Sequence, residues 1–362
     1  MNNPRTVISF VNAAHFLDHY AMLIFAAAVV VMAPIFGMTY SEFLPYATPG
    51  FVAFGAGSLL TGWLGDRWSR RHMLAIYFVG LGAALIATGF ARTPQQLSLA
   101  LFAIGAFGSI YHPVGTAMLV AYAAEVGREV GINGVWGNLG VASAALVTGI
   151  LTQYFGWQSA FVVPGAIAIG LGLAFTRAVA HEKRVMSSSA AAVRVDPGAM
   201  KRVILALVVT IVASSTTFNA ITVAIPKLFA ERLTTLTHST AWIGVIAAAV
   251  YVFGALAQYT IGHLLDRHSL KSVFLPMAFL LAPLLAAAAF SSGWLLILVS
   301  IGIVIGIFGQ VTINDAMVAK YTSDQWRARA FAARYFLGFT AAGASVALVA
   351  WLHDRGGFEL ML

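Results

Sequence analysis

Of the thirteen acidic residues, two lie inside long apolar stretches, and both are candidates for chemistry within a membrane. Asp18 lies in the apolar run 7–36, and Asp315 lies in the run 294–319. An ionisable side chain at the centre of a bilayer costs about 2.5–3.5 kcal/mol on insertion scales, so it needs a partner or a function. We therefore take these two carboxyl groups as the centres of the candidate site.

Two histidines share a helical face with Asp18. His15, Asp18 and His19 have the spacing i, i+3, i+4, which brings their side chains to one side of a helix. We interpret Asp18 as a proton-binding group that His19 tunes; the alternative is a buried, hydrogen-bonded polar pair that holds helices together. His112 lies at comparable depth in another run, although its ring could instead satisfy a carbonyl freed by Pro113.

Asp315 and Arg334 lie at similar depth in the last two apolar runs. They could form a buried structural ion pair, which often adds little net stability, or they could bind anions or protons. Polar residues elsewhere in the runs could line a solute pathway or merely bridge helices. With the residues already named, the candidates for this pathway are His15, His112, Asn133, Trp136, Asn138, Asn219, Gln310, Asn314, Asp315 and Arg334.

The composition predicts that these residues lie within a lipid bilayer. The 362 residues are 60% hydrophobic and 9% charged, whereas a soluble domain has roughly a quarter of its residues charged. Eleven apolar runs are long enough to span a membrane as helices, in which every backbone polar group is satisfied. They are residues 7–36, 42–64, 73–91, 97–123, 130–155, 157–175, 203–229, 241–265, 273–290, 294–319 and 328–352.

The basic residues indicate an orientation. If the N-terminus and the hydrophilic segment 179–200 are cytoplasmic, all but four of the 21 Lys and Arg residues lie on or near the cytoplasmic side. This asymmetry explains the net charge of +8 without nucleic acid. We expect a monomeric, multi-pass protein of the bacterial inner membrane. Cysteine is absent and no H-E-x-x-H motif occurs, so we expect no enzyme activity, cofactor or resident metal.

The sequence repeats itself at an offset of 200 to 201 residues. Residues 62–71 match 262–271, and the pairs Gly105 and Gly306, Gly137 and Gly338 continue the repeat. This predicts two similar six-helix halves, residues 1–178 and 201–362, with 179–200 as a cytoplasmic linker. The repeat also places the start of a twelfth helix at Phe358, so we expect five complete helices in the second half, with helix 12 missing or truncated.

Residues 62–71 carry a motif of known transporters. The segment resembles the G-x-L-A-D-R-x-G-R-K motif of the major facilitator superfamily and departs from it at Gly65 and Ser69. The resemblance implies two bundles related by a pseudo-twofold axis, with helices 1, 4, 7 and 10 around a cavity. It also implies a conformational latch at the cytoplasmic ends, in which arginines could pair with Glu125 or Glu129. The latch residues would be Gly62, Asp66, Arg67, Arg70, Arg71, Gly262, Asp266 and Arg267. The alternative for Asp66 and Asp266 is simple solvation of helix ends.

Three further segments resemble the fosmidomycin-resistance branch of bacterial exporters: 15–20, 111–113 and 131–134. The resemblance implies a secondary active carrier that moves a small organic solute outward in exchange for protons. Leu101 stands where related drug–proton antiporters often have arginine, so coupling must rest on other residues. Three alternatives remain: uptake of an organic anion attracted by Arg334 and the histidines, export of a transition metal through the residues around Asp18, and a receptor or scaffold that transports nothing.

Overall fold

The computed structural model describes residues 2–180, 197–321 and 324–362, and in these ranges the chain is helical. The elements are α1 (Pro4–Ile35), α2 (Tyr40–Phe43), η1 (Leu44–Ala47), α3 (Thr48–Arg67), α4 (Arg70–Gly89), α5 (Pro94–Gly108), η2 (Tyr111–Gly115), α6 (Thr116–Tyr122), α7 (Val126–Phe155), α8 (Ser159–Ala178), α9 (Pro197–Arg232), α10 (Thr240–Arg267), α11 (Leu270–Phe290), α12 (Gly293–Tyr321) and α13 (Asp324–Met361). Together they contain eleven segments long and apolar enough to cross a membrane, as predicted.

Helix starts are set by short polar side chains between the apolar runs. Ser69 and Ser269 accept hydrogen bonds from the backbone N–H groups of His72 and Ser272, and Thr93 caps α5 in the same way. Such caps satisfy donors that the first turn of a helix leaves unpaired. Ser69 and Ser269 are 200 residues apart, so the two halves begin their third spans with the same local structure.

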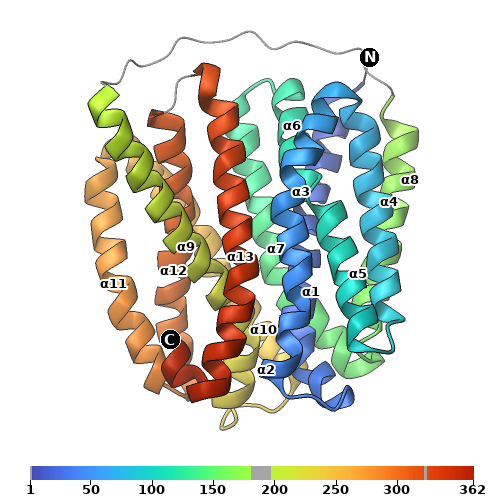
Figure 1. Ribbon diagram of the computed structural model, residues 1–362, viewed down its shortest axis with the longest axis vertical. Helices are drawn as coiled ribbons and strands as arrows, with labels where there is room; N and C mark the ends of the chain where they lie inside the picture. The colour runs from blue at the N-terminus through green and yellow to red at the C-terminus, as the bar shows by residue number, and fades with distance from the viewer. Residues whose placement is uncertain (1, 181–196, 322–323) are drawn as a thin grey trace.

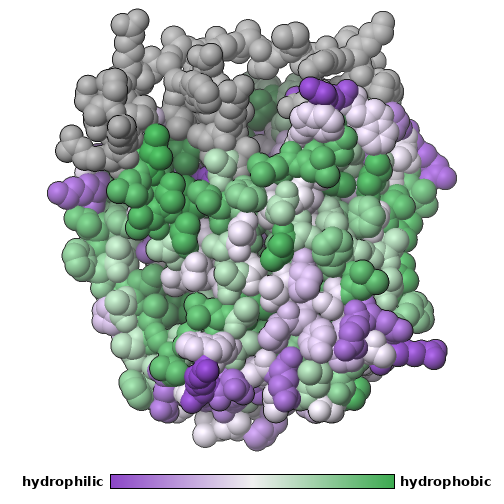
Figure 2. Space-filling model, in the orientation of Figure 1, coloured by the Kyte–Doolittle hydropathy of each residue, from purple (hydrophilic) through white to green (hydrophobic). Residues whose placement is uncertain are grey.

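The helices run side by side in two groups, α1–α8 and α9–α13 (Figure 1). We call the end that carries Asn2 and Ala180 the N-terminal face, because Asn2 Oδ1 accepts a hydrogen bond from the Ala180 N–H at 2.7 Å. The other end, which carries Ser41 and His353, is the opposite face. Figure 2 shows hydrophobic residues over much of the middle of one side of the molecule, with strongly hydrophilic residues towards its ends.

The repeat is visible in backbone breaks that fall at equivalent positions. Gly156 has φ 84° before α8, and Gly357 has φ 59° inside α13. Positive φ is accessible to glycine because it has no Cβ. The last run was predicted to end at residue 352, and the long helix of α13 is interrupted close to there, by non-helical backbone at Gly356 and Gly357, before a short helical segment that reaches Met361. Phe358, which was expected to open a further helix, is buried at the start of the short helical segment that follows this break.

The two halves contact each other closely at the opposite face. Gly149 of α7 and Gly244 of α10 allow these helices to approach: a Cβ on Gly149 would lie 2.7 Å from the Thr240 carbonyl oxygen. Nearby, Gln153 Oε1 accepts hydrogen bonds from Ser239 Oγ at 2.6 Å and from the Ala241 N–H at 2.9 Å. These contacts join the end of α7 to the start of α10.

A second group of contacts at this face links α2 to α13 and α9. Ser41 Oγ lies 2.9 Å from His353 Nδ1, and His353 Nε2 lies 3.2 Å from Glu231 Oε1. Lys227 Nζ lies 3.1 Å from the same Glu231 oxygen and 5.5 Å from the centre of the Tyr40 ring. Glu231 therefore contacts both Lys227 and His353. His353 in turn contacts Ser41, which belongs to the first half of the chain.

This arrangement predicts that Glu231→Gln loosens the opposite face, because it removes the charge that both Lys227 and His353 contact. The chain has no cysteine, so spin labels at Arg92→Cys and Ser292→Cys, in exposed loops of the two halves, can report their separation without a background signal. We expect Glu231→Gln to add a longer component to the distance distribution measured by electron paramagnetic resonance. The exposed Glu359→Gln is the matched control, and identical distributions in both variants would contradict the prediction.

Candidate functional site

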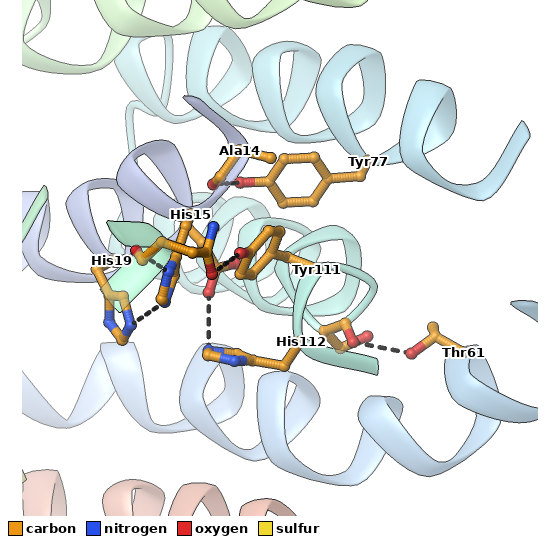
Figure 3. A network of polar contacts seen from close by, with 10 residues as sticks. Ala14, His15, His19, Thr61, Tyr77, Tyr111 and His112 are labelled. Atoms are coloured by element: carbon orange, nitrogen blue, oxygen red, sulfur yellow. Dashed lines mark hydrogen bonds and ion pairs between the residues drawn. The ribbon is translucent and has the colours of Figure 1, made fainter. Parts of the chain in front are cut away.

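Three histidines gather between α1 and η2. His15 Nδ1 lies 2.7 Å from the Asn133 carbonyl oxygen, and His15 Nε2 lies 3.1 Å from His19 Nε2. The His112 ring centre is 5.5 Å from that of each of the other two. Figure 3 shows the three rings side by side, with His15 between His19 and Tyr111. The helical spacing on α1 therefore brings His15 and His19 to one face, and η2 supplies the third ring.

Asp18 lies beside this cluster and is almost fully buried, with 1% of its surface exposed. His112 Nε2 is 3.3 Å from Asp18 Oδ2, within ion-pair distance, but the contact lacks the geometry of a hydrogen bond. Both carboxyl oxygens are therefore without a hydrogen-bond partner among the described residues. A carboxylate in this condition is costly, so the group requires a proton or a cation.

The local backbone explains why His112 can turn to Asp18. Pro113 lacks an N–H group and lies in η2, a short π-helical segment, which is a common feature of functional sites. In a regular α-helix the Pro113 nitrogen would face the Ser109 carbonyl. Thr61 Oγ1 donates a hydrogen bond to that carbonyl at 2.8 Å. The carbonyl freed by the proline is thus satisfied by Thr61 (Figure 3), and the His112 ring is available for Asp18.

Asn133 connects the cluster to residues that the sequence analysis did not select. Tyr111 donates to Asn133 Oδ1 at 2.9 Å, and Asn133 Nδ2 donates to Asn12 Oδ1 at 2.8 Å. Asn12 precedes His15 by three positions, so helical spacing could have identified it. Gly137, one turn after Asn133, leaves room for His15: a Cβ there would lie 2.6 Å from His15 Nε2.

In the second half, the structure brings Asp315 and Arg334 together. Arg334 Nη1 lies 2.8 Å from Asp315 Oδ1, and Nη2 donates to the Val311 carbonyl at 3.2 Å. The Arg334 side chain is 10% exposed, and its buried Nε has no hydrogen-bond partner among the described residues. The pair therefore joins a nearly buried guanidinium group to a carboxyl group that is 38% exposed, and the Nε–H donor is left without a partner among the described residues.

Aromatic rings connect the two charged sites across the halves. The His112 ring stacks on Tyr335, with centres 5.0 Å apart and planes at 28°, and also lies 5.0 Å from Phe339. Phe54 packs against Phe339 at 4.4 Å. Tyr335 follows Arg334 directly, so His112 contacts Asp18 on one side and the neighbour of the Asp315–Arg334 pair on the other. The sequence alone does not single out these rings, because aromatic residues are common throughout the apolar runs.

Of the other pathway candidates in the first half, Asn138 contacts the second half. Its Nδ2 donates to Gln258 Oε1 of α10 at 2.6 Å, and Gln258 was not predicted. Trp136 is 40% exposed, and its ring lies 6.5 Å from Phe16 on α1. Asn138 therefore joins α7 to α10, whereas Trp136 packs beside the cluster.

The candidates in the second half are mostly engaged in helix packing. Asn219 donates to the Ser215 carbonyl within its own helix. Asn314 Nδ2 donates to Ser214 Oγ at 2.6 Å, which joins α12 to α9. Gln310 is buried one turn before Asn314. These positions stabilise the bundle, and their part in solute binding stays a prediction.

The predicted latch is described only in part, because the side chains of Asp66 and Asp266 lie outside the described part of the structure. Arg71 donates to the Thr176 carbonyl at 2.6 Å and to the Val179 carbonyl, which ties α4 to the end of α8. Arg70 contacts the Ala117 carbonyl at 3.4 Å. These contacts lie within the first half of the chain.

The remaining latch positions differ in their packing. Arg67 lies over the Trp63 ring at 4.6 Å, and Arg267 is exposed. Gly62 faces Pro113, from which a Cβ would be 3.1 Å away, whereas a Cβ on Gly262 would meet nothing within 4 Å. The expected pairing partners of the arginines, Glu125 and Glu129, lie near the start of α7; Glu125 is exposed and 3.9 Å from Arg128. The latch role itself stays a prediction.

His15, His19 and His112 are also the described residues that could approach a metal ion. One ring nitrogen of each lies within 4.8 Å of the others. His15, however, contacts the Asn133 carbonyl through one nitrogen and His19 through the other. The nitrogens that His15 and His19 would offer to a metal ion thus already contact each other at 3.1 Å.

The family model of the Major Facilitator Superfamily matches residues 10–234 and 207–362. The chain therefore belongs to the Major Facilitator Superfamily, and it is a multi-pass membrane protein whose described residues contain eleven apolar helices long enough to span a membrane. Membership in this family of transporters, rather than any missing motif, identifies it as a protein that is not an enzyme.

Two curated relatives match part of the chain. It is 31% identical to the puromycin resistance protein pur8 of Streptomyces alboniger over 153 residues, which are 41% of this chain and 29% of that protein. It is 29% identical to the probable sulfoacetate transporter SauU of Cupriavidus necator over 142 residues, 38% of this chain and 31% of that protein. The chain thus matches less than a third of the length of these relatives.

Solved structures with the same fold cover nearly the whole chain. A bacterial homologue of the human lysosomal transporter Spinster, in an inward-facing and occupied conformation, gives a TM-score of 0.81 at 13% identity, over 98% of this chain and 83% of that one. The D-xylose–proton symporter gives 0.72 at 15% identity, over 97% and 90%. At these identities the likeness establishes the fold alone.

If Asp315 and Arg334 pair for structural reasons, Asp315→Asn or Arg334→Ala alone should lower the folded yield. Asp315→Asn leaves the charge of Arg334, whose side chain is 10% exposed, nearly buried and unpaired, which typically costs about 3–5 kcal/mol. Arg334→Ala leaves Asp315, which is 38% exposed, without its partner, and should cost less. The double exchange Asp315→Arg with Arg334→Asp should restore part of the monodisperse peak in size-exclusion chromatography. Full yield of Arg334→Ala, together with lost binding of anionic solutes, would instead assign the arginine to solute binding.

Proposed function

We propose that the protein is a secondary active transporter that moves a small organic solute by alternating access, outward and in exchange for protons. Membership in the superfamily supports transport, and the buried Asp18 carboxyl group supports proton coupling. The observation that carries the proposal is that both Asp18 oxygens are buried without a hydrogen-bond partner among the described residues. The ionised form of such a group is stable when water reaches it, and the protonated form is stable when water is excluded. A change in hydration would therefore make the group bind or release a proton.

In the proposed cycle, Asp18 is protonated when the site is closed to water and loses its proton when one side hydrates it. A neutral carboxyl group is the less costly form in a dry site. His112 is the partner in direct contact at 3.3 Å, and His19 acts more remotely, through His15. We assign proton binding to Asp18. We assign adjustment of that binding to His19, which would act through its contact with His15 and not by touching the carboxyl group.

The pathway and the conformational machinery follow from the same proposal. His15, His112, Asn133 and the interhalf contact at Asn138 would line or border the route in the first half. In the second half, Asp315 and Arg334 would border it. The segments at 62–71 and 262–271 would act as the latch on the N-terminal face, which we place in the cytoplasm.

The outward direction rests on the resemblance to fosmidomycin-resistance exporters in the segments around His15, His112 and Asn133. The partial match to a puromycin resistance protein agrees with it, because such proteins confer resistance to a small organic compound. The charge asymmetry of the loops supports a location in the bacterial inner membrane with a cytoplasmic N-terminus, and we propose that the monomer is the working unit.

One observation favours a second function, the uptake of an organic anion. Arg334 is nearly buried, and its unpartnered Nε could receive a carboxylate while Nη1 keeps Asp315. Export of a transition metal has less support, because both nitrogens of His15 are already engaged. The two functions differ in the direction of transport. In the proposed exchange, solute and protons cross the membrane in opposite directions, whereas in the alternative the anion is taken up.

The test of proton coupling is Asp18→Asn, which mimics the protonated group permanently. In proteoliposomes, the variant should still fold and still exchange solute for solute, but it should lose accumulation driven by a pH gradient. His19→Ala should be milder and shift the pH optimum of transport, because His19 does not contact the carboxyl group directly. Solute flux with and without a gradient is the measurement, screened over a panel of organic compounds.

The exposed acid Asp354 provides the control, since Asp354→Asn removes a carboxylate outside the site and should leave gradient-driven flux unchanged. Accumulation at the wild-type level in Asp18→Asn would show that the proton is carried elsewhere. In that case Asp315 becomes the next candidate.

A further inference from the structure

The start of α10 is completed by a side chain from the other half of the chain. A helix leaves its first four N–H groups without a partner inside the helix, so groups outside it must satisfy them. We infer that Gln153 of α7 is a gate residue, which caps α10 across the two halves when the opposite face is closed and releases it when that face opens. The inference rests on the alternating access of the proposed function and assigns one contact to its control.

One oxygen of Gln153 accepts from two donors at this helix start. Ser239 is the N-cap residue of α10, and its Oγ accepts a hydrogen bond from the Trp242 N–H at 3.2 Å. The same hydroxyl donates to Gln153 Oε1 at 2.6 Å, and the Ala241 N–H donates to this oxygen at 2.9 Å. Gln153 therefore satisfies a further backbone donor of the helix and also orients the hydroxyl that caps it.

The internal repeat explains why α10 uses a cap from outside its own half. At an offset of 200 residues, Ser239 corresponds to Thr39, the N-cap residue of α2. Thr39 belongs to a capping box, in which Glu42 Oε2 accepts hydrogen bonds from the Thr39 N–H at 2.8 Å and from Thr39 Oγ1 at 2.9 Å. The residue equivalent to Glu42 is Trp242, whose side chain has no acceptor. The start of α10 takes the missing acceptor from Gln153 instead.

The course of α7 and α10 shows why this cap is lost when the opposite face opens. The end of α7 meets the start of α10, so the two helices run antiparallel, and further along Asn138 Nδ2 donates to Gln258 Oε1 at 2.6 Å. Continued towards the N-terminal face, this pairing would bring Gly262 opposite Gly131 and Gly134. A Cβ on any of these glycines would meet nothing within 4 Å in the described structure. The helices therefore touch at the closed face and part at the other, and the reverse movement separates the cap.

Substitutions of Gln153 should shift the balance between closed and open faces in opposite directions. Gln153→Ala removes the acceptor, and the loss of a helix cap typically shifts an equilibrium about fivefold, here away from the closed face. Gln153→Glu places a carboxylate at the N-terminus of α10, where negative charge is favourable and the hydrogen bonds become stronger. The closed face should then gain about threefold.

A second variant tests the cap while Gln153 stays in place. Trp242→Glu gives α10 the capping box that Thr39 and Glu42 form in the first half, so its carboxylate competes with Gln153 for the Ser239 hydroxyl hydrogen. It should act in the direction of Gln153→Ala. Trp242 is 61% exposed, so its replacement leaves the packing of the core intact. Trp242→Phe keeps a ring, adds no acceptor and is the control.

The measurement uses the purified full chain without solute and without a pH gradient. Spin labels at Arg92→Cys and Ser292→Cys report the separation of the halves at the opposite face by electron paramagnetic resonance. We expect the longer distance component to grow in Gln153→Ala and Trp242→Glu and to shrink in Gln153→Glu. Amide hydrogen exchange reports the cap itself: the Ala241 N–H should exchange about fivefold faster in Gln153→Ala.

Gln158 provides the matched control. It is exposed, immediately precedes α8 in the first half and makes no side-chain cap in the described structure. Gln158→Ala and Gln158→Glu therefore make the same chemical changes at a helix start without an inter-half cap, and both readouts should stay at the wild-type values.

Two results would overturn the inference. One is that Gln153→Ala, Gln153→Glu and Trp242→Glu all keep the wild-type distances and exchange rates. The other is a longer component in Gln153→Glu as large as that in Gln153→Ala. Flux assays separate these results from failure of the proposed function. Shifted distances without gradient-driven flux support the cap and contradict proton coupling, whereas gradient-driven flux with unchanged distances contradicts the cap alone.

Discussion

The interaction on which the site depends is the contact of Asp18 with His112 in a region without hydrogen bonds for the carboxyl group. Water would solvate this group at small cost, but the apolar helices around it exclude water. Because the cost of ionisation is then large, dehydration of the site favours the neutral carboxyl group and hydration favours the ionised one. In the transport cycle that we propose, alternating access would change this hydration. The rest of the first half can be understood as the structure that holds this one group in place.

That structure is made of close helix contacts. Gly137 and Gly140 bring α7 against α1, since a Cβ on Gly137 would strike the His15 ring. The close approach lets the Asn133 carbonyl fix His15, which in turn contacts His19. On the other side, Thr61 satisfies the carbonyl that Pro113 frees. Small residues thus act by letting polar groups on neighbouring helices meet.

Apolar length predicted the eleven spans, because a helix that crosses a bilayer must be continuous in hydrophobicity, and the repeat predicted the break at Gly357. Helical spacing placed His15, Asp18 and His19 on one face. It could not reveal that His112 contacts Asp18, since this depends on the π-helical turn at η2, nor that Tyr335 packs on His112, since this depends on how the halves are docked. Contacts between distant helices are set by packing, which residue types alone do not encode.

The two halves contribute different charged groups to the region where they meet. The first half carries the buried acid Asp18, which we propose to bind and release a proton. The second half carries the Asp315–Arg334 ion pair, in which Oδ1 and Nη1 lie 2.8 Å apart. His112 and Tyr335 stack between them, so a movement of α13 alters the surroundings of His112 and, through it, those of Asp18. In the cycle that we propose, a change of protonation at Asp18 would be linked to the position of α13 through the direct contacts of His112 with Asp18 and Tyr335.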